Sequence, residues 1–273
     1  EHNDYNGFET QPNVRLLWTP SAHQVVWAAV SRAVRTPTRN YEDIRVTLQP
    51  TPGPGGLPIV PTLLGNKKSK TEEGRAYEFG YRIQPGKKLS LDLATFYNRY
   101  DLGLTVEEGL PFFEPNPQPA HLIIPLRFDN LLRSETYGWE ASANLDLVRR
   151  WKVRGSFSGL RVHLHAPSQS TVPEAAPGLQ PRQQFQLHSY LKLPRNFELG
   201  HSLYYVSGLS ETQIPAYTRF DTRLGWRVRE GIELSLELQN LLDDRHPEFN
   251  SLDTFVVPSQ VGRSIYGKMA WRF

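Results

Sequence analysis

About eleven segments of this sequence alternate apolar and polar residues with a period of two, as β-strands with one apolar face do. Short turns and long connections alternate strictly between these segments, which is typical of a membrane barrel with tight turns at one rim and long loops at the other. The sequence therefore predicts an all-β, antiparallel transmembrane β-barrel. The segments are 8–18, 24–34, 73–84, 89–101, 134–147, 151–165, 182–193, 197–207, 216–228, 232–239 and 261–273. The turns are 19–23, 85–88, 148–150, 194–196 and 229–231, and the long connections are 35–72, 102–133, 166–181, 208–215 and 243–260.

The last segment also resembles the C-terminal signal strand of bacterial outer-membrane barrels. One face of residues 261–273 is mainly apolar and closes on an aromatic residue, with a second aromatic two positions before it. The resemblance implies that Met269, Trp271 and Phe273 direct assembly of the barrel. The apolar face is predicted to consist of Val261, Ile265, Gly267, Met269, Trp271 and Phe273.

Other strands predict the lipid-facing surface in the same way. The outward residues are expected to be Tyr77, Phe79, Tyr81, Leu89, Leu91, Leu93, Leu234, Leu236, Leu238 and Met269. Two features depart from the simple pattern. Alternation fades after Gly159, which predicts a β-bulge there. The connections 35–72 and 102–133 are rich in Pro and Gly, so we expect them to be irregular.

Composition excludes several classes. The net charge of +3 is spread along the chain without a basic stripe, so nucleic acid is not expected as a partner. No apolar run reaches the roughly 18 residues of a membrane helix. A β-propeller would need a repeated blade motif of about 40 residues, and none is present.

Several phrases resemble TonB-dependent outer-membrane receptors. Trp27–Arg39 resembles their strand-and-loop entry, and Glu78–Arg82 followed by Leu91–Asn98 resembles a pair of their strands. Gly138–Glu140 is similar to their "YGxE" strand start, and Gln239–Phe249 to the "NLxD" segment before their last strand. The matches run through the whole chain in family order.

The resemblance implies a Gram-negative outer-membrane location and active uptake of a scarce ligand, most often a ferric siderophore. Such receptors join an N-terminal plug to a barrel of about 22 strands. Residues 1–273 match the C-terminal half of the barrel, and neither the plug nor the segment that binds TonB can be located in them. The implied partners are membrane lipid, the barrel-assembly machinery, the small-molecule ligand and, through the missing N-terminal part, the TonB system. A passive porin-like channel and a soluble or secreted β-sheet binding module are the alternatives.

No catalytic, metal or cofactor site is expected. His163 and His165 share a face but lack an acidic or Cys partner at a defined spacing, and no G-x-S-x-G motif occurs. The carboxylates Asp221, Glu233 and Glu237 are expected to line a polar lumen beside Arg219 and Arg223. The candidate ligand-binding residues are Arg32, Arg35, Arg39, Tyr41 and His121.

The strand count carries one further expectation. With about eleven antiparallel strands, the first and last run in the same direction, so closing the sheet on itself would require a parallel pair. We therefore expect residues 1–273 to form an open sheet or half-barrel that does not transport by itself.

Overall fold

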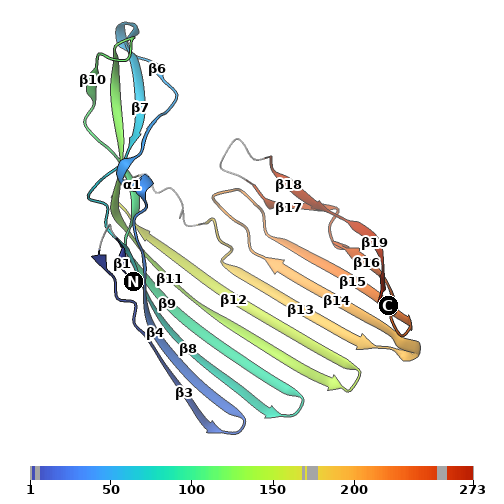
Figure 1. The fold of residues 1–273 in the computed structure, drawn as a ribbon. Coiled ribbons are helices and arrows are strands. Elements are labelled where there is room, and N and C mark those ends of the chain that lie inside the picture. The colour runs from blue at the N-terminus through green and yellow to red at the C-terminus, as the bar shows by residue number, and fades with distance from the viewer. Residues whose placement is uncertain (1, 4–6, 168–169, 171–177, 251–256, 273) are drawn as a thin grey trace.

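The computed structural model describes residues 2–3, 7–167, 170, 178–250 and 257–272 and contains one large open sheet (Figure 1). The main path of this sheet passes through eleven strands in the order β19-β16-β15-β14-β13-β12-β11-β9-β8-β4-β3, and every neighbouring pair on it is antiparallel. In the described residues, no helix has the length and apolar character needed to span a membrane. The strands are β3 (Asn13–Ser21), β4 (Gln24–Arg35), β8 (Glu72–Gly86), β9 (Leu89–Glu108), β11 (His121–Val148), β12 (Trp151–His165), β13 (Gln183–Lys192), β14 (Phe197–Val206), β15 (Tyr217–Arg229), β16 (Ile232–Gln239) and β19 (Ser264–Trp271).

The sheet is open, as the strand count predicts. Strands β3 and β19 are the two ends of the strand order and lie on opposite sides of the molecule in Figure 1. Both run toward the rim of short turns. The tight turns predicted near residues 148–150, 194–196 and 229–231 are present. Gly231 closes its turn with a φ of 81°, which L side chains rarely adopt.

The two long connections at 35–72 and 102–133 are not irregular, so that prediction is wrong. Strand β9 continues to Glu108 and β11 begins at His121, and both project beyond the other strands in Figure 1. Strand β7 (Pro58–Leu64) pairs in parallel with the start of β11. The other elements of this projection, which we call the arm, are α1 (Arg39–Asp43), β5 (Arg45–Thr47), β6 (Thr51–Pro52), η1 (Pro54–Gly56) and β10 (Phe112–Glu114).

The arm holds several of the most deeply buried side chains among the described residues, including Val60, Thr62, Thr105 and Ile123. Its strands project past the lipid-covered part of the sheet into water. They therefore need a hydrophobic core of their own, which the pairing of β7 with β11 supplies.

Both chain ends depart from the predicted strands. Residues 7–8 form β2 (Gly7–Phe8), which pairs with β1 (His2–Asn3), so Phe8 does not belong to β3. At the other end, Val261 lies in β18 (Ser259–Gly262), opposite β17 (Arg245–Phe249). The terminal strand begins only after Arg263. Met269 and Trp271 lie in β19, and Phe273 is outside the described residues.

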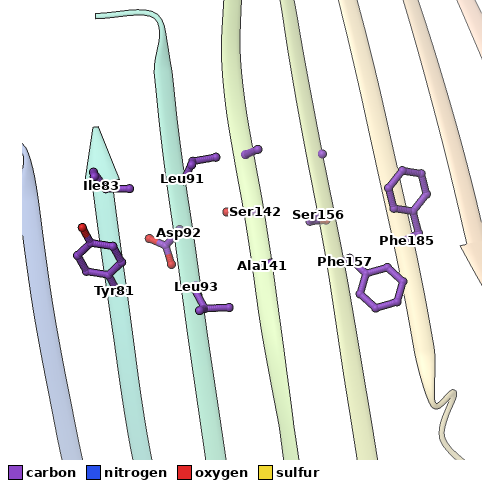
Figure 2. Close-up of a pocket in the computed structure, with 12 residues that line it drawn as sticks. Tyr81, Ile83, Leu91, Asp92, Leu93, Ala141, Ser142, Ser156, Phe157 and Phe185 are labelled. Atoms are coloured by element: carbon purple, nitrogen blue, oxygen red, sulfur yellow. The ribbon is translucent and has the colours of Figure 1, made fainter. Parts of the chain in front are cut away.

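The register confirms that all ten predicted outward residues share one face. Tyr81 lies opposite Leu93, and the same row continues across the sheet through Ala141 and Phe157. Figure 2 shows these side chains around a hollow of about 510 Å³, which exists because Ala141 and its neighbours are small. At the far end of the sheet, Leu234 lies opposite Met269. A face of this kind is the lipid-covered face of a membrane barrel.

The predicted bulge after Gly159 is absent, because β11 and β12 pair without a shift from Arg133 to Asp146. The alternation changes there because the polarity of the two faces reverses. Below Gly159 the apolar side chains of β12, such as Phe157, point to the lipid face. Above it, Arg161 and His163 take that face, and Leu160, Val162 and Leu164 take the other. The reversal marks the level at which the strands leave hydrocarbon.

Candidate functional site

A cavity of about 880 Å³ lies where the sheet meets the arm, on the face opposite the lipid belt. The outer ends of β4, β8, β9, β11 and β12 form its wall, and α1 adds a tyrosine. Its size is in the range of small-molecule sites, which combine apolar walls with a few polar groups. The side chains on the wall are mostly apolar or uncharged, among them Phe96, Asn98, Tyr100, Thr136, Leu160 and Val162.

A charged pair and two tyrosines give this cavity its polar groups. The Nε and Nη2 atoms of Arg35 donate to the same oxygen of Glu72, at 2.8 and 2.6 Å, and the guanidinium remains half exposed. The ring of Tyr41 packs 5.2 Å from that of Phe128. Tyr100 lies opposite Gly74, and a Cβ there would come within 3.2 Å of its ring. The cavity can therefore offer a guanidinium and aromatic faces to an anionic or aromatic ligand.

The structure brings together two of the five candidate ligand residues. Arg35 and Tyr41 line the cavity. Arg32 lies on the opposite face of β4, where its guanidinium pairs with Glu9 and Glu73. The other two are also placed away from the cavity.

Arg39 is exposed on α1 and lies 3.9 Å from Asp43. His121 is buried in the arm, with Nδ1 3.0 Å from the carbonyl oxygen of Pro119 and Nε2 3.7 Å from Glu114. Sequence reasoning missed Tyr100 and Glu72 as lining residues. The reversal of polarity along β9 and β12 was the signal that could have identified this region.

The carboxylates that were predicted to line a polar lumen lie beside the expected arginines. The Arg223 guanidinium lies between Glu233 and Glu237, at 2.5 and 3.4 Å. Arg219 pairs with Asp221 at 2.8 Å. Each carboxylate therefore has a cation beside it, which is unlike a catalytic pair of carboxylates. On the lipid side, the His163 ring stacks on Tyr137 at 5.6 Å.

Glu73 lies on β8, four residues from Tyr77 on the side of the arm, and two guanidinium groups hold its carboxylate. The guanidinium groups of Arg32 and Arg75 lie 3.2 and 2.5 Å from its Oε1. Burial alone would raise the pKa of Glu73, but the two guanidinium groups outweigh burial and hold the pKa below its usual value.

A match between the sequence and a protein-family model identifies the family of this chain. The family model for "TonB dependent receptor-like, beta-barrel" matches residues 1–241, which is most of the chain. The chain belongs to this family. TonB-dependent receptors are transporters rather than enzymes, and their barrels reside in the outer membrane of Gram-negative bacteria.

Solved structures show the same fold. A mutant of the ferric enterobactin receptor PfeA from Pseudomonas aeruginosa matches 100% of this receptor chain with a TM-score of 0.74 at 16% identity. The siderophore receptor PirA from Acinetobacter baumannii matches 99% of it with a TM-score of 0.73 at 15% identity. The copper transporter OprC matches 96% with a TM-score of 0.64 at 17% identity. This chain spans 41%, 42% and 39% of their respective lengths.

Proposed function

We infer that the complete protein takes up a ferric siderophore by active transport across the outer membrane. The observation that carries this proposal is the cavity of about 880 Å³ at the outer end of a TonB-dependent receptor barrel. Structural neighbours named as siderophore receptors support the ligand class. The cavity supports it chemically, because Arg35 offers a cation for an anionic ferric chelate and Tyr41 and Tyr100 offer aromatic faces.

The partners follow from the family. Energy is proposed to come from the inner-membrane proton gradient through TonB, which would bind a part of the protein outside residues 1–273. The apolar belt requires membrane lipid, and insertion of such a sheet requires the barrel-assembly machinery. Because the chain spans about two fifths of the matched receptors, the plug and the rest of the barrel are proposed to come from the remainder of the protein.

Uptake of radiolabelled iron by cells that produce the complete protein tests this function. The ligands would be a panel of ferric siderophores, beginning with the ferric enterobactin of the neighbouring receptor. Arg35→Gln is expected to raise the half-saturating concentration at least about tenfold, because a hydrogen bond to a charged group contributes about 1.5–3 kcal/mol. Arg39→Gln is the matched control, since Arg39 is exposed outside the cavity lining.

Two outcomes would reject the proposal. Uptake that persists after a protonophore collapses the proton gradient would favour the passive channel. Saturable uptake of copper, without uptake of any ferric siderophore, would instead favour copper transport, the function for which the neighbouring structure OprC is named. The residues of this chain give copper little support, because it has one Met and no Cys, the soft ligands that Cu(I) prefers.

A further inference from the structure

Three arginines lie side by side at the outer margin of the lipid-facing surface. Arg32 of β4 is the cross-strand partner of Arg75 of β8, and Arg75 is the partner of Arg99 of β9. We call these three residues the arginine row. Like charges directly opposite each other on neighbouring strands are destabilising, so such a row needs anions to compensate it.

Part of the compensation comes from carboxylates within the protein. Glu73 lies between Arg32 and Arg75, and Arg32 also pairs with Glu9. Asp101 accepts two hydrogen bonds from Arg99, at 3.0 and 3.1 Å, and Glu135 of β11 is the cross-strand partner of Arg99. A fourth cation, Arg133 of β11, lies 3.9 Å from Asp101.

The carboxylates of Glu73 and Asp101 are less exposed than the guanidinium groups they pair with. The side chains of Glu73 and Asp101 are only 18% and 20% exposed, whereas those of Arg75, Arg99 and Arg133 are 48%, 46% and 70% exposed. A guanidinium has five N–H donors, and its ion pairs here leave much of its surface open. The exposed surface of the cluster therefore consists mainly of guanidinium groups, whose orientation the less exposed carboxylates fix.

The depth of the arginine row identifies what it meets. The next row toward the short turns consists of Tyr77, Tyr97 and Tyr137, which are cross-strand partners on the same face. Aromatic rows of this kind mark the membrane interface of a barrel. Two residues along a strand span about 6.6 Å, so the arginine row lies just outside the hydrocarbon, at the depth of lipid headgroups.

We propose that Arg75 and Arg99, with Arg32 and Arg133 at their sides, bind the phosphate groups of an anionic lipid in the outer leaflet. The guanidinium fork matches a phosphate group with two parallel hydrogen bonds. The hollow lined by Tyr81, Leu93 and Phe157 lies nearer the bilayer centre on the same face, where the acyl chains of that lipid run (Figure 2).

Native mass spectrometry of the complete protein, purified from outer membranes in mild detergent, tests this site. The wild-type protein is expected to retain a phosphate-bearing lipid, and the double variant R75Q/R99Q is expected to lose most of it. The double variant R149Q/R150Q removes the same charge from the exposed turn between β11 and β12 and is expected to retain the lipid. R75K/R99K keeps the charge without the planar fork and is expected to retain an intermediate amount.

A second measurement distinguishes the loss of lipid binding from the loss of folding. It also distinguishes a lipid phosphate from free phosphate as the bound group. Stripped protein would be titrated with the phosphorylated lipid extract, with the same extract after phosphatase treatment, and with inorganic phosphate. Only the first is expected to raise the melting temperature of the wild type, and it should leave that of R75Q/R99Q unchanged. Equal retention by all variants, an equal shift with the dephosphorylated lipid, or saturation by inorganic phosphate alone would overturn the proposal. Ferric siderophore uptake is read separately, so its failure does not bear on this site.

Discussion

The ring of Phe96 occupies the space that a side chain at Gly138 would need. The two residues are cross-strand partners on β9 and β11. A Cβ at Gly138 would lie 2.7 Å from Cζ of Phe96 and 2.2 Å from the carbonyl oxygen of Gly159. We therefore predict that Gly138→Ala destabilises the barrel of the complete protein by about 1–3 kcal/mol, the usual cost of overpacking. The measurement is the temperature at which the folded band is lost on a semi-native gel.

Gly267→Ala is the control for this prediction. The nearest atom to a Cβ at Gly267 is the carbonyl oxygen of Ser235, at 3.9 Å, so there is room for a methyl group. Its unfolding temperature should stay close to that of the wild type. Equal effects of the two substitutions would show that the close approach of Phe96 does not determine the cost.

Leu236 is predicted to face lipid, and its neighbour Glu237 is predicted to face water. Leu236 lies opposite Leu224 and Gly267 in the apolar belt, and Glu237 pairs with Arg223 on the other face. Leu236→Arg should therefore destabilise the assembled receptor by about 2–4 kcal/mol if residue 236 lies near the bilayer midplane.

Spin labels test the same assignment without a buried charge. A label at position 236 should be accessible to oxygen dissolved in lipid, and a label at 237 to a water-soluble nickel reagent. The reverse accessibility would mean that the register of β16 is displaced by one residue, which turns every side chain to the other face.

The sequence was sufficient for the sheet because the period of two repeats in almost every strand of the belt. It was insufficient for the arm. Pro61 and Pro125 lie inside β7 and β11, and Pro normally argues against an interior strand. For this reason the connections 35–72 and 102–133 were predicted to be irregular, although residues 58–64 and 122–126 are short apolar runs. The parallel pairing of these runs joins segments about 60 residues apart, which no local pattern specifies.

Sequence reasoning identified some residues of the candidate site and missed others. Arg35 and Tyr41 were found because charged and aromatic residues near a loop suggest ligand contact. Tyr100 was assigned to the end of an ordinary strand, and Arg32 was assigned to the ligand side. A pattern with a period of two predicts which residues share a face, but it does not predict where along the strand that face changes its surroundings.

Glu73 makes a testable contribution to the dependence of stability on pH. Its pKa is lowered in the folded protein, so it stabilises the fold above the ordinary glutamate pKa of about 4.3. That contribution is lost as the pH falls through the lowered pKa, because the unfolded chain then binds the proton more readily. Glu73→Gln should therefore lower the melting temperature of the complete protein at pH 7 and have a smaller effect near pH 3.

Glu78→Gln provides the comparison, because Glu78 lies five residues from Glu73 along β8 and on the other face of the sheet. Its effect on the melting temperature should be small at both pH values. A Glu73→Gln effect that is the same at pH 7 and pH 3 would contradict the role assigned to the two guanidinium groups.

The last prediction concerns residues 1–273 produced alone. Strands β3 and β19 end the sheet and both run toward the short turns, so they could close it only as a parallel pair. Single-chain bacterial barrels have even numbers of antiparallel strands, and each unpaired backbone group in hydrocarbon costs several kcal/mol. In water, the same sheet would expose its apolar belt and two edges that can pair with other chains. We therefore expect the purified chain to aggregate without detergent and to show no steady single-channel conductance in planar bilayers, where the complete protein serves as the reference. A soluble monomer, or hydrogen bonds between β3 and β19 detected by cross-linking of engineered cysteine pairs, would refute this expectation.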